Sequence, residues 1–378
     1  MKFVHLSDLH LGKRVNEFSM LEDQRHILLR VLQVVGQERP DAVVIAGDVY
    51  DKPVPPAEAV AMFDEFLVRL AGMKLQVFVI SGNHDSAERI AFGGRLMDAS
   101  GIHMAPVYSG ETAPFVMTDG YGEVRIHMLP FIKPADVRRA YPGEEAGSYT
   151  EAFRTAVSHM NVDPSVRNVL VAHQFVTGAV RSESEDVSVG GMDNIDASVF
   201  DSFDYVALGH IHGPQHIGRE TVRYCGAPLK YSFSEKDHQK SATVVTMRQK
   251  GETEIRTVPL EPMHDMREIR GTYNDLTLRT NYEGTATADY LHVILTDEED
   301  VPDALARLRT VYPNIMKLDY DNTRTRNAGC MSAPEELERK SEIELFETFF
   351  EQQNGRPMSE EQRSFSGRLL EKVREDMR

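Results

Sequence analysis

The feature of this sequence that most restricts its fold is a set of short apolar runs, each followed by an acidic, amide or imidazole side chain. Residues 43–46 (Val-Val-Ile-Ala) lead into Gly47 and Asp48. A run of that length is typical of a buried β-strand, and Gly47 allows a sharp turn or a close approach of the backbone to a ligand. Asp48 then lies at the carboxyl end of the strand, where open α/β sheets bind their ligands.

Four further runs end in the same way. They are residues 2–6, followed by Asp8 and His10; 76–80, followed by Asn83, His84 and Asp85; 168–172, followed by His173; and 205–208, followed by His210 and His212. Segments with helical apolar spacing, at residues 22–37 and 57–70, separate the runs at 2–6, 43–46 and 76–80. This alternation predicts an α/β fold with right-handed crossovers and helices on the face of the sheet. Our hypothesis is that the five strand ends converge on two metal ions.

The side chains at these ends have the chemistry of a dinuclear centre. They are two carboxylates, one amide and four imidazoles, without a thiolate: Asp8, His10, Asp48, Asn83, His173, His210 and His212. Oxygen and imidazole ligands favour Mn, Fe or Zn, and seven ligands exceed what one tetrahedral zinc accepts. We expect Asp8, His10 and His212 on one metal, Asn83, His173 and His210 on the other, and Asp48 on both. Two such metals clamp a phosphoryl group and activate a bridging water.

His84 and Asp85 are the predicted catalytic pair. His84 would protonate the leaving oxygen or stabilise the charged transition state, and Asp85 would orient its ring. The same segment is also typical of a helix N-cap before Ala87, and the two roles are compatible. His127, within an alternating run, is predicted to be an ordinary strand residue.

Length and composition set the domain plan and the compartment. A chain of 378 residues exceeds one core, and we expect domains at residues 1–262, 263–330 and 331–378. The second is a small α/β cap, with strands at 290–295 and 315–320 and a helix at 301–312. The third is a pair of amphipathic helices that either folds back or offers an apolar face to a partner helix.

Charge and apolar content exclude several classes of protein. The net charge of −17 argues against a protein that coats nucleic acid, but it allows an enzyme that holds a few phosphates through bound cations. No run of about eighteen apolar residues predicts a membrane span, and no leader predicts secretion. Two cysteines form neither a disulfide framework nor a zinc site. A cytoplasmic protein is therefore expected.

The ordered strand ends resemble the calcineurin-like metallophosphoesterase family over roughly residues 1–215. The matching segments are Asp8-Leu9-His10, Gly47-Asp48, Gly82-Asn83-His84-Asp85, His173 and Gly209-His210-Ile211-His212. The resemblance implies a four-layer αββα sandwich, here with a small α/β cap domain and a C-terminal helical pair. Residues 81–92, 129–134, 172–174 and 229–235 extend the resemblance, toward the SbcD family of bacterial nuclease subunits, over nearly the whole chain.

That narrower resemblance implies a manganese-dependent DNA nuclease with exonuclease and with hairpin or single-strand endonuclease activity. It also implies a DNA-binding cap, a homodimer within a heterotetramer, and an SbcC-type ATPase bound through residues 331–378. Archaeal and eukaryotic relatives carry a further histidine in the loop after the bridging aspartate. This sequence has Asp51 there, so the catalytic role falls to His84.

Seven basic residues lie in segments near the predicted site, and we expect a subset of them to contact DNA phosphates. They are Lys13, Arg14, Lys52, Arg89, Lys133, Arg181 and Lys230. Two alternatives stay open. A small-molecule phosphomonoesterase or cyclic-nucleotide phosphodiesterase could use the same metals, although it would need neither cap nor helical pair. A non-catalytic scaffold is disfavoured because every ligand position carries a competent side chain.

Overall fold

The structure, a computed structural model, describes residues 1–185, 193–328, 341–354 and 356–376. The chain divides into two compact units, residues 1–266 and 267–378. We predicted the first boundary after residue 262. The predicted tail (331–378) and the predicted cap (263–330), except for residues 263–266, fall in the range of the second unit. Residues 329–330 of the cap, and 331–340, 355 and 377–378 of the tail, lie outside the described residues.

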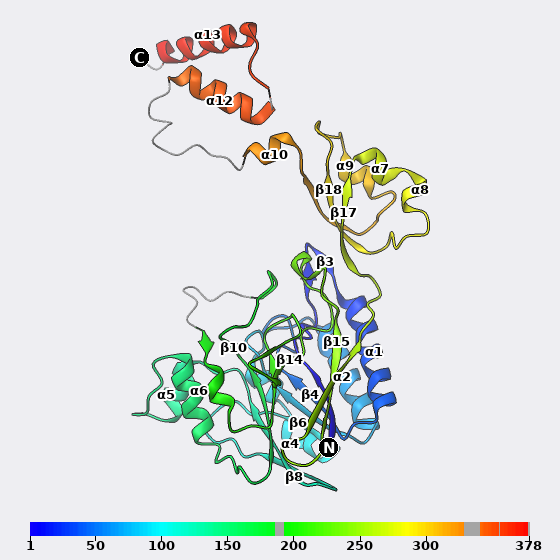
Figure 1. Cartoon of the computed structure of the whole chain (residues 1–378), viewed down its shortest axis with the longest axis vertical. Helices are drawn as coiled ribbons and strands as arrows, with labels where there is room; N and C mark the ends of the chain where they lie inside the picture. The colour runs from blue at the N-terminus through cyan, green and yellow to red at the C-terminus, as the bar shows by residue number, and fades with distance from the viewer. Residues whose placement is uncertain (186–192, 329–340, 355, 377–378) are drawn as a thin grey trace. The chain divides into compact units, whose positions relative to one another are not determined.

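Two six-stranded sheets form the first unit (Figure 1). The first sheet has the order β16 (Thr253–Pro259), β15 (Ser241–Met247), β1 (Lys2–Leu6), β4 (Ala42–Ala46), β5 (Gln76–Ile80) and β6 (Ile102–Met104). The second has the order β13 (Gln215–Ile217), β14 (Arg219–Tyr224), β12 (Tyr205–Gly209), β9 (Arg167–His173), β8 (Gly122–Leu129) and β7 (Phe115–Asp119). Strands β1, β4, β5 and β6 run parallel, as do β14, β12, β9 and β8.

The parallel strands are buried on both faces, which explains their continuous apolar runs. Successive side chains of a strand point to opposite faces. In β9, Val169 and Val171 therefore pack between the two sheets. Leu170 and Ala172 point the other way, into the layer formed with the helices. The core thus has an inter-sheet layer and a separate helix-facing layer.

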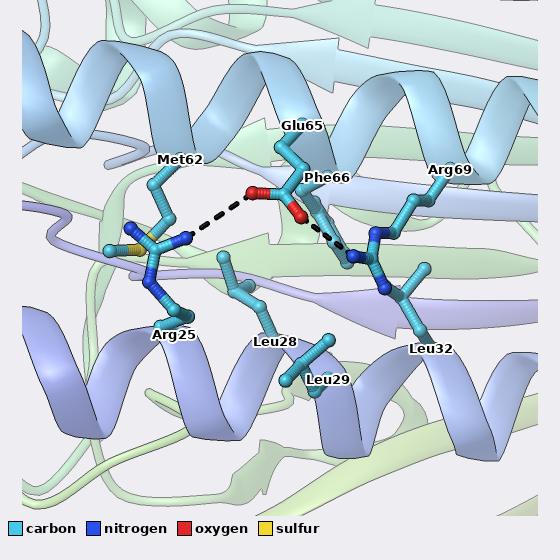
Figure 2. A pocket seen from close by; sticks show the side chains of 8 residues that line it. All are labelled: Arg25, Leu28, Leu29, Leu32, Met62, Glu65, Phe66 and Arg69. Carbon is cyan, nitrogen blue, oxygen red and sulfur yellow. Dashed lines mark hydrogen bonds and ion pairs between the residues drawn. The ribbon is translucent and has the colours of Figure 1, made fainter.

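Helices cover the outer faces of the sheets. Helices α1 (Leu21–Glu38) and α2 (Ala57–Gly72) run side by side, with an Arg25–Glu65–Arg69 ion-pair chain across the groove between them (Figure 2), and α2 contacts β5. Helices α5 (Pro134–Ala140) and α6 (Tyr149–Ser158) pack on the second sheet. The predicted αββα sandwich is confirmed.

Short elements complete the first unit. They are β2 (Arg14–Val15), β3 (Phe18–Ser19), α3 (Ala87–Ala91), α4 (Gly94–Met97), β10 (Phe175–Val176) and β11 (Asn194–Ile195). His127 lies buried in β8, and its Nε2 is 3.1 Å from the Asn168 Oδ1. Its place in the middle of a strand agrees with the structural role predicted for it.

The second unit is built on a three-stranded sheet of β17 (Met266–Gly271), β18 (Tyr290–Leu295) and β19 (Ile315–Tyr320). Its helices are α7 (Tyr273–Thr277), α8 (Arg279–Tyr282), α9 (Ala304–Leu308), α10 (Thr323–Ala328), α12 (Glu342–Asn354) and α13 (Glu360–Asp376). Helix α9 begins later than the predicted 301–312, because Asp303 adopts a φ of 52°, which a right-handed helix cannot contain, and it ends at Leu308. None of the helices described here combines the length and apolarity of a bilayer span.

Candidate metal centre

The predicted ligands meet at one edge of the first unit because they follow strands that run parallel within their sheets. Asp8 and His10 follow β1, Asp48 follows β4, Asn83 follows β5, His173 ends β9, and His210 and His212 follow β12. Backbone pairing continues past β1 and β4. The Asp8 amide donates to the Gly47 carbonyl, and the His10 amide to the Asp48 carbonyl, each at 3.0 Å. These bonds fix the first two loops side by side.

One part of the edge joins Asp8, His10 and His212, whose ligand atoms all lie within 4.8 Å of one another. The Nε2 atoms of His10 and His212 are 3.0 Å apart. Nδ1 of His212 lies 2.7 Å from the Ser184 hydroxyl, which itself donates to Glu235. His212 Nδ1 must therefore carry the hydrogen, so its Nε2 presents a lone pair toward His10.

A second part joins Asp8, Asp48 and His173, again with ligand atoms within 4.8 Å. Nδ1 of His173 donates to the Ala46 carbonyl at 2.8 Å, so a neutral ring has its lone pair on Nε2. That atom faces Asp48 Oδ2 at 3.2 Å and Asn83 Oδ1 at 3.0 Å. Asn83 Oδ1 also lies 2.8 Å from His210 Nδ1. Three acceptor atoms thus converge.

This arrangement fits divalent cations. Lone pairs that face one another repel unless a proton or a cation lies between them. Within the described chain, the buried His10 Nδ1 and His210 Nε2 also have no hydrogen-bond partner. Asp48 Oδ2 lies 3.6 Å from His10 Nε2 as well as 3.2 Å from His173 Nε2. The carboxylate therefore stands between the two groups, as a bridging ligand requires.

Electrostatics favour the metal-binding form of three donors, Asp48, His10 and His210, whereas His173 must lose a proton to bind a cation. Burial raises the pKa of Asp48, but the His173 and His10 imidazoles outweigh it and hold that pKa below its usual range. Burial lowers the pKa of His10, and burial together with His173 lowers the pKa of His210 to about 3. For His173 the negative charge of Asp48 outweighs burial and raises the pKa to about 9. A charged Asp48 and neutral His10 and His210 can all donate electron pairs.

The backbone at this edge is strained. Asp8, His10, Asp48 and His210 have positive φ angles of 54°, 43°, 49° and 101°. A left-handed conformation costs a non-glycine residue about 1–2 kcal/mol, and such strain clusters at functional sites. The fold therefore spends stability to aim these side chains at one point.

Glycine is required where the two sheets approach at this edge. Gly47 has a φ of 86°, and a Cβ there would lie 2.3 Å from His173 Nδ1. A Cβ on Gly209 would lie 1.9 Å from the Ala46 carbonyl oxygen. These clashes explain why glycine precedes Asp48 and His210 in the sequence.

His84 lies half-buried beside the ligands. It forms a further group with His10 and Asp48 whose ligand atoms lie within 4.8 Å, and its ring centroid is 4.9 Å from that of His10. Its amide donates to Asp48 Oδ1 at 2.9 Å, and its Nδ1 lies 3.1 Å from the Asp51 carbonyl oxygen. The His84 ring therefore lies next to the predicted ligands His10 and Asp48.

The Asp85 carboxylate is surrounded by backbone amides. It accepts hydrogen bonds from the Val49, Tyr50 and Gly82 amides at 3.1, 2.9 and 2.9 Å. It therefore braces the loops after β4 and β5, which carry Asp48 and His84. Burial and the charge of Asp48 raise the pKa of Asp85 to about 7. The helix after this segment is capped by Ser86, which accepts from the Arg89 amide.

An outer shell around His212 was not predicted from the sequence. Glu185 accepts from the His212 amide at 2.6 Å, and Lys240 donates to the His212 carbonyl at 2.9 Å. Glu235, fully buried, receives both the Ser184 hydroxyl and the Lys240 ammonium. The only sequence signal was the run at 229–235, noted for its resemblance alone. Such partners commonly fix the orientation of metal-binding histidines.

The seven basic residues separate into two sets. Lys13, Arg181 and Lys230 are paired with Asp51, Asp193 and Asp265 at 2.7, 3.1 and 2.8 Å, and the Arg14 guanidinium donates to the Glu17 carbonyl. Lys52, Arg89 and Lys133 are exposed, as is Arg14. The exposed set is the better source of contacts to an external phosphate.

Comparisons with known proteins agree with this geometry. Residues 1–214 match the family described as calcineurin-like phosphoesterase, and residues 262–354 match a domain described as type 5 capsule protein repressor C-terminal domain. Two proteins named as the SbcD component of nuclease SbcCD, from Staphylococcus epidermidis and Staphylococcus saprophyticus, are each 31% identical over 322 residues. These matches cover 84% of this chain and 85% and 84% of the two relatives.

Two solved structures also align with the chain. One is a dimetal phosphatase from Danio rerio, with a TM-score of 0.41 and 13% identity. The other is TT1561 from Thermus thermophilus, with a TM-score of 0.42 and 12% identity. Each alignment covers 69% of this chain and 99% of the other.

Proposed function

The chain belongs to the calcineurin-like phosphoesterase family, and from this premise we propose that it is a metal-dependent DNA nuclease with exonuclease and with hairpin or single-strand endonuclease activity. The observation that carries the proposal is the convergence of buried imidazole and oxygen acceptors at one strand edge. The relatives named as the SbcD component of nuclease SbcCD support the choice of DNA over a small phosphate ester.

We assign the metal ligands as follows. Asp8, His10 and His212 would hold one divalent cation, Asn83, His173 and His210 the other, and Asp48 would bind both. A bound pair of such cations neutralises a phosphoryl group and lowers the pKa of a bridging water. The donor set suits Mn, Fe or Zn, and we propose Mn²⁺. The strained backbone and the Asp85 brace keep the donors in place before any substrate arrives.

His84 would supply the proton chemistry. Its amide is fixed on Asp48 and its Nδ1 on the Asp51 carbonyl, so Nδ1–H is the donor of that bond and Nε2 is the nitrogen that would exchange a proton. A protonated Nε2 at the edge can donate to the leaving oxygen of a phosphodiester or stabilise its charge. Exposed Lys52, Arg89 and Lys133 would hold the flanking phosphates, which positions DNA without reading its sequence.

The test uses the purified full chain with Mn²⁺ on a DNA hairpin, a linear duplex, a phosphomonoester and a cyclic nucleotide. We expect cleavage of a DNA hairpin and of a linear duplex end, and loss of both activities on addition of EDTA. A chain that hydrolyses a phosphomonoester or a cyclic nucleotide but leaves DNA intact would instead be a small-molecule phosphatase. Fewer than one metal per chain after soaking in Mn²⁺ would favour a scaffold.

We also propose an SbcC-type ATPase partner that binds residues 331–378. Large apolar side chains on α12 and α13 support a partner surface. Phe346, Phe349, Phe365 and Leu369 are 40%, 56%, 61% and 53% exposed. Deletion of 331–378 should abolish co-purification with the ATPase while metal content stays the same. Retained complex formation would place the interface elsewhere.

A homodimer within a heterotetramer would give a second apolar surface a partner. Phe92 and Leu96 are 83% and 84% exposed at α3 and α4, and exposed apolar residues that gather are typical of interfaces. Light scattering of the wild type and of a Phe92→Glu variant tests this surface. A mass that stays dimeric in the variant would exclude it.

The cysteine content supports a cytoplasmic setting.

A further inference from the structure

An open pocket lies directly beside His212, the last of the proposed metal ligands in the sequence. Residues 180–181, 213–215 and 238–239 line a pocket of about 420 Å³, which lies within the range of small-molecule sites, about 300–1,000 Å³. We propose that this pocket receives the nucleobase of a nucleotide next to the scissile phosphate. The inference rests on the proposed nuclease function and names a substrate contact for the same site.

Two walls of the pocket are continuous with the metal centre. Gly213 directly follows His212, so one wall is the ligand loop itself. On another wall, the Arg181 guanidinium lies 3.6 Å from the centre of the Phe175 ring. The Phe175 ring centroid is in turn 6.4 Å from that of His210. A nucleotide whose phosphate sits at the metals therefore has its base within reach of this pocket.

The walls offer flat and apolar surfaces. The His238 ring lies against Gly213, where an added Cβ would be 3.1 Å from His238 Cε1. Val180, at 74% exposure, leaves an apolar side chain uncovered. Bases stack on imidazole, guanidinium and apolar faces with little dependence on sequence. These surfaces suit a heterocycle better than a hydrated sugar.

The charge of the pocket favours an uncharged group. Arg181 is paired with Asp193 at 3.1 Å, so its positive charge is already balanced. None of the lining residues in the described chain carries a carboxylate. A phosphate would find no free cation here beyond the balanced one, whereas a neutral base meets no charge that it must desolvate.

Polar atoms remain for the edge of the base. His238 Nδ1 is enclosed by protein and has no hydrogen-bond partner among the described residues, so it can reach a base only after the His238 ring rotates. Gln239 is exposed beside it. Gln215 has a different task, because its amide accepts from the Val180 amide and donates to the Val180 carbonyl, both at 2.9 Å. Gln215 thus shapes the wall, while His238 and Gln239 can bind a ligand.

The experiment compares DNA with a substrate that has no base. The full chain with Mn²⁺ is assayed on a short oligonucleotide, on the same oligonucleotide with an abasic site on either side of the cleaved bond, and on bis(p-nitrophenyl) phosphate. In the wild type, the abasic site on the occupied side should lower kcat/KM about tenfold, as expected for one stacked base. In His238→Ala and Gln239→Ala, the ratio of kcat/KM on intact DNA to that on the small diester should fall, about tenfold and about threefold. In His238→Ala, kcat/KM on the abasic oligonucleotide should be nearly the same as kcat/KM on the intact oligonucleotide.

His216→Ala is the matched control, because His216 is exposed on β13 and does not line the pocket. Its ratio should equal that of the wild type. A wild type that cleaves DNA but shows neither the abasic effect nor a change of ratio in the two variants overturns this inference and leaves the nuclease proposal standing. A wild type that cleaves no DNA overturns both. Equal losses on DNA and on the small diester would show that His238 only supports the fold, which also overturns the inference.

Discussion

Both compact units bury histidines in a β-sheet, but they give them different neighbours. In the second unit, the buried His292 of β18 has Asp319 Oδ2 2.8 Å from its Nε2 and Glu268 Oε2 3.7 Å from its Nδ1. In the first unit, His10 and His212 face each other, and His173 faces an amide and a carboxylate oxygen. A carboxylate on each side satisfies a histidine, whereas converging acceptor atoms need a proton or a cation between them.

An unpartnered nitrogen alone does not mark a metal site. His5 Nε2 and His127 Nδ1 also have no partner in the described chain, although both residues lie within strands. The strand-end histidines differ because their lone pairs point at other acceptors and because neighbouring ligands have positive φ angles. The combination of mutual facing and backbone strain is therefore the better criterion.

The difference between the histidines of the two units is tested most directly by removing one carboxylate charge in each unit. Asp48→Asn should lower kcat on bis(p-nitrophenyl) phosphate about 10³-fold or more, because it removes the charge shared by both metal groups. Elemental analysis should find at most one metal per chain. Asp319→Asn, in the second unit, should change neither quantity and should cost at most about 1 kcal/mol of stability. Two metals retained in Asp48→Asn would contradict the bridging role.

A pair of glycines tests the strained edge against an unstrained turn. Gly47→Ala should lower the free energy of unfolding by about 3 kcal/mol or more, since it adds a steric clash with His173 to the cost of a positive φ. Gly284, in the second unit, has a similar φ of 81° but nothing within 4 Å of an added Cβ. Gly284→Ala should therefore cost only about 1 kcal/mol. Equal losses in chemical denaturation would show that the close packing at Gly47 has no energetic weight.

The sequence predicted the parts of the fold that are buried on both faces. Runs such as 42–46 and 205–209 are continuous and apolar, so they were found, together with the ligands that follow them. Strands β7, β14 and β16 were not, because half-exposed strands carry mixed side chains that resemble loops. The helix predicted at 301–312 starts at Ala304 instead, because apolar spacing does not reveal the φ of Asp303.

The outer shell shows a second limit of sequence reasoning. Ser184, Glu235 and Lys240 reach His212 from loops that are distant in the chain, and no local periodicity brings them together. Asp85 illustrates the same limit at short range. Its neighbour in the sequence is His84, but its carboxylate turns to the amides of two loops. Motif spacing identifies the ligands, whereas their supports depend on tertiary packing.

His84 sharpens the comparison because it is an edge histidine that we assign to proton transfer and not to a metal. His84→Gln should lower DNA cleavage about 10²-fold, as expected for a lost general acid, while the metal content stays at the wild-type value. His292→Gln serves as the control in the second unit and should leave cleavage unchanged. Activity within about tenfold of wild type would show that His84 is not the acid, and loss of metal would make it a ligand.

The smallest expected effect comes from the hydrogen bond that sets the lone pair of His212. In Ser184→Ala the His212 Nδ1–H loses its acceptor, so the ring is free to change tautomer or rotate, and Mn²⁺ affinity should fall about tenfold. Titration followed by electron paramagnetic resonance measures the affinity without reference to activity. Nitrogen chemical shifts of labelled histidine should show one His212 tautomer in the wild type and a mixture in the variant. Ser184→Thr keeps the hydroxyl and should restore both readouts. If Ser184→Ala binds Mn²⁺ as tightly as the wild type, the facing lone pairs at His10 and His212 do not depend on the outer shell. The difference between His212 and His292 would then be due to the proposed metal ligands and not to the residues around them.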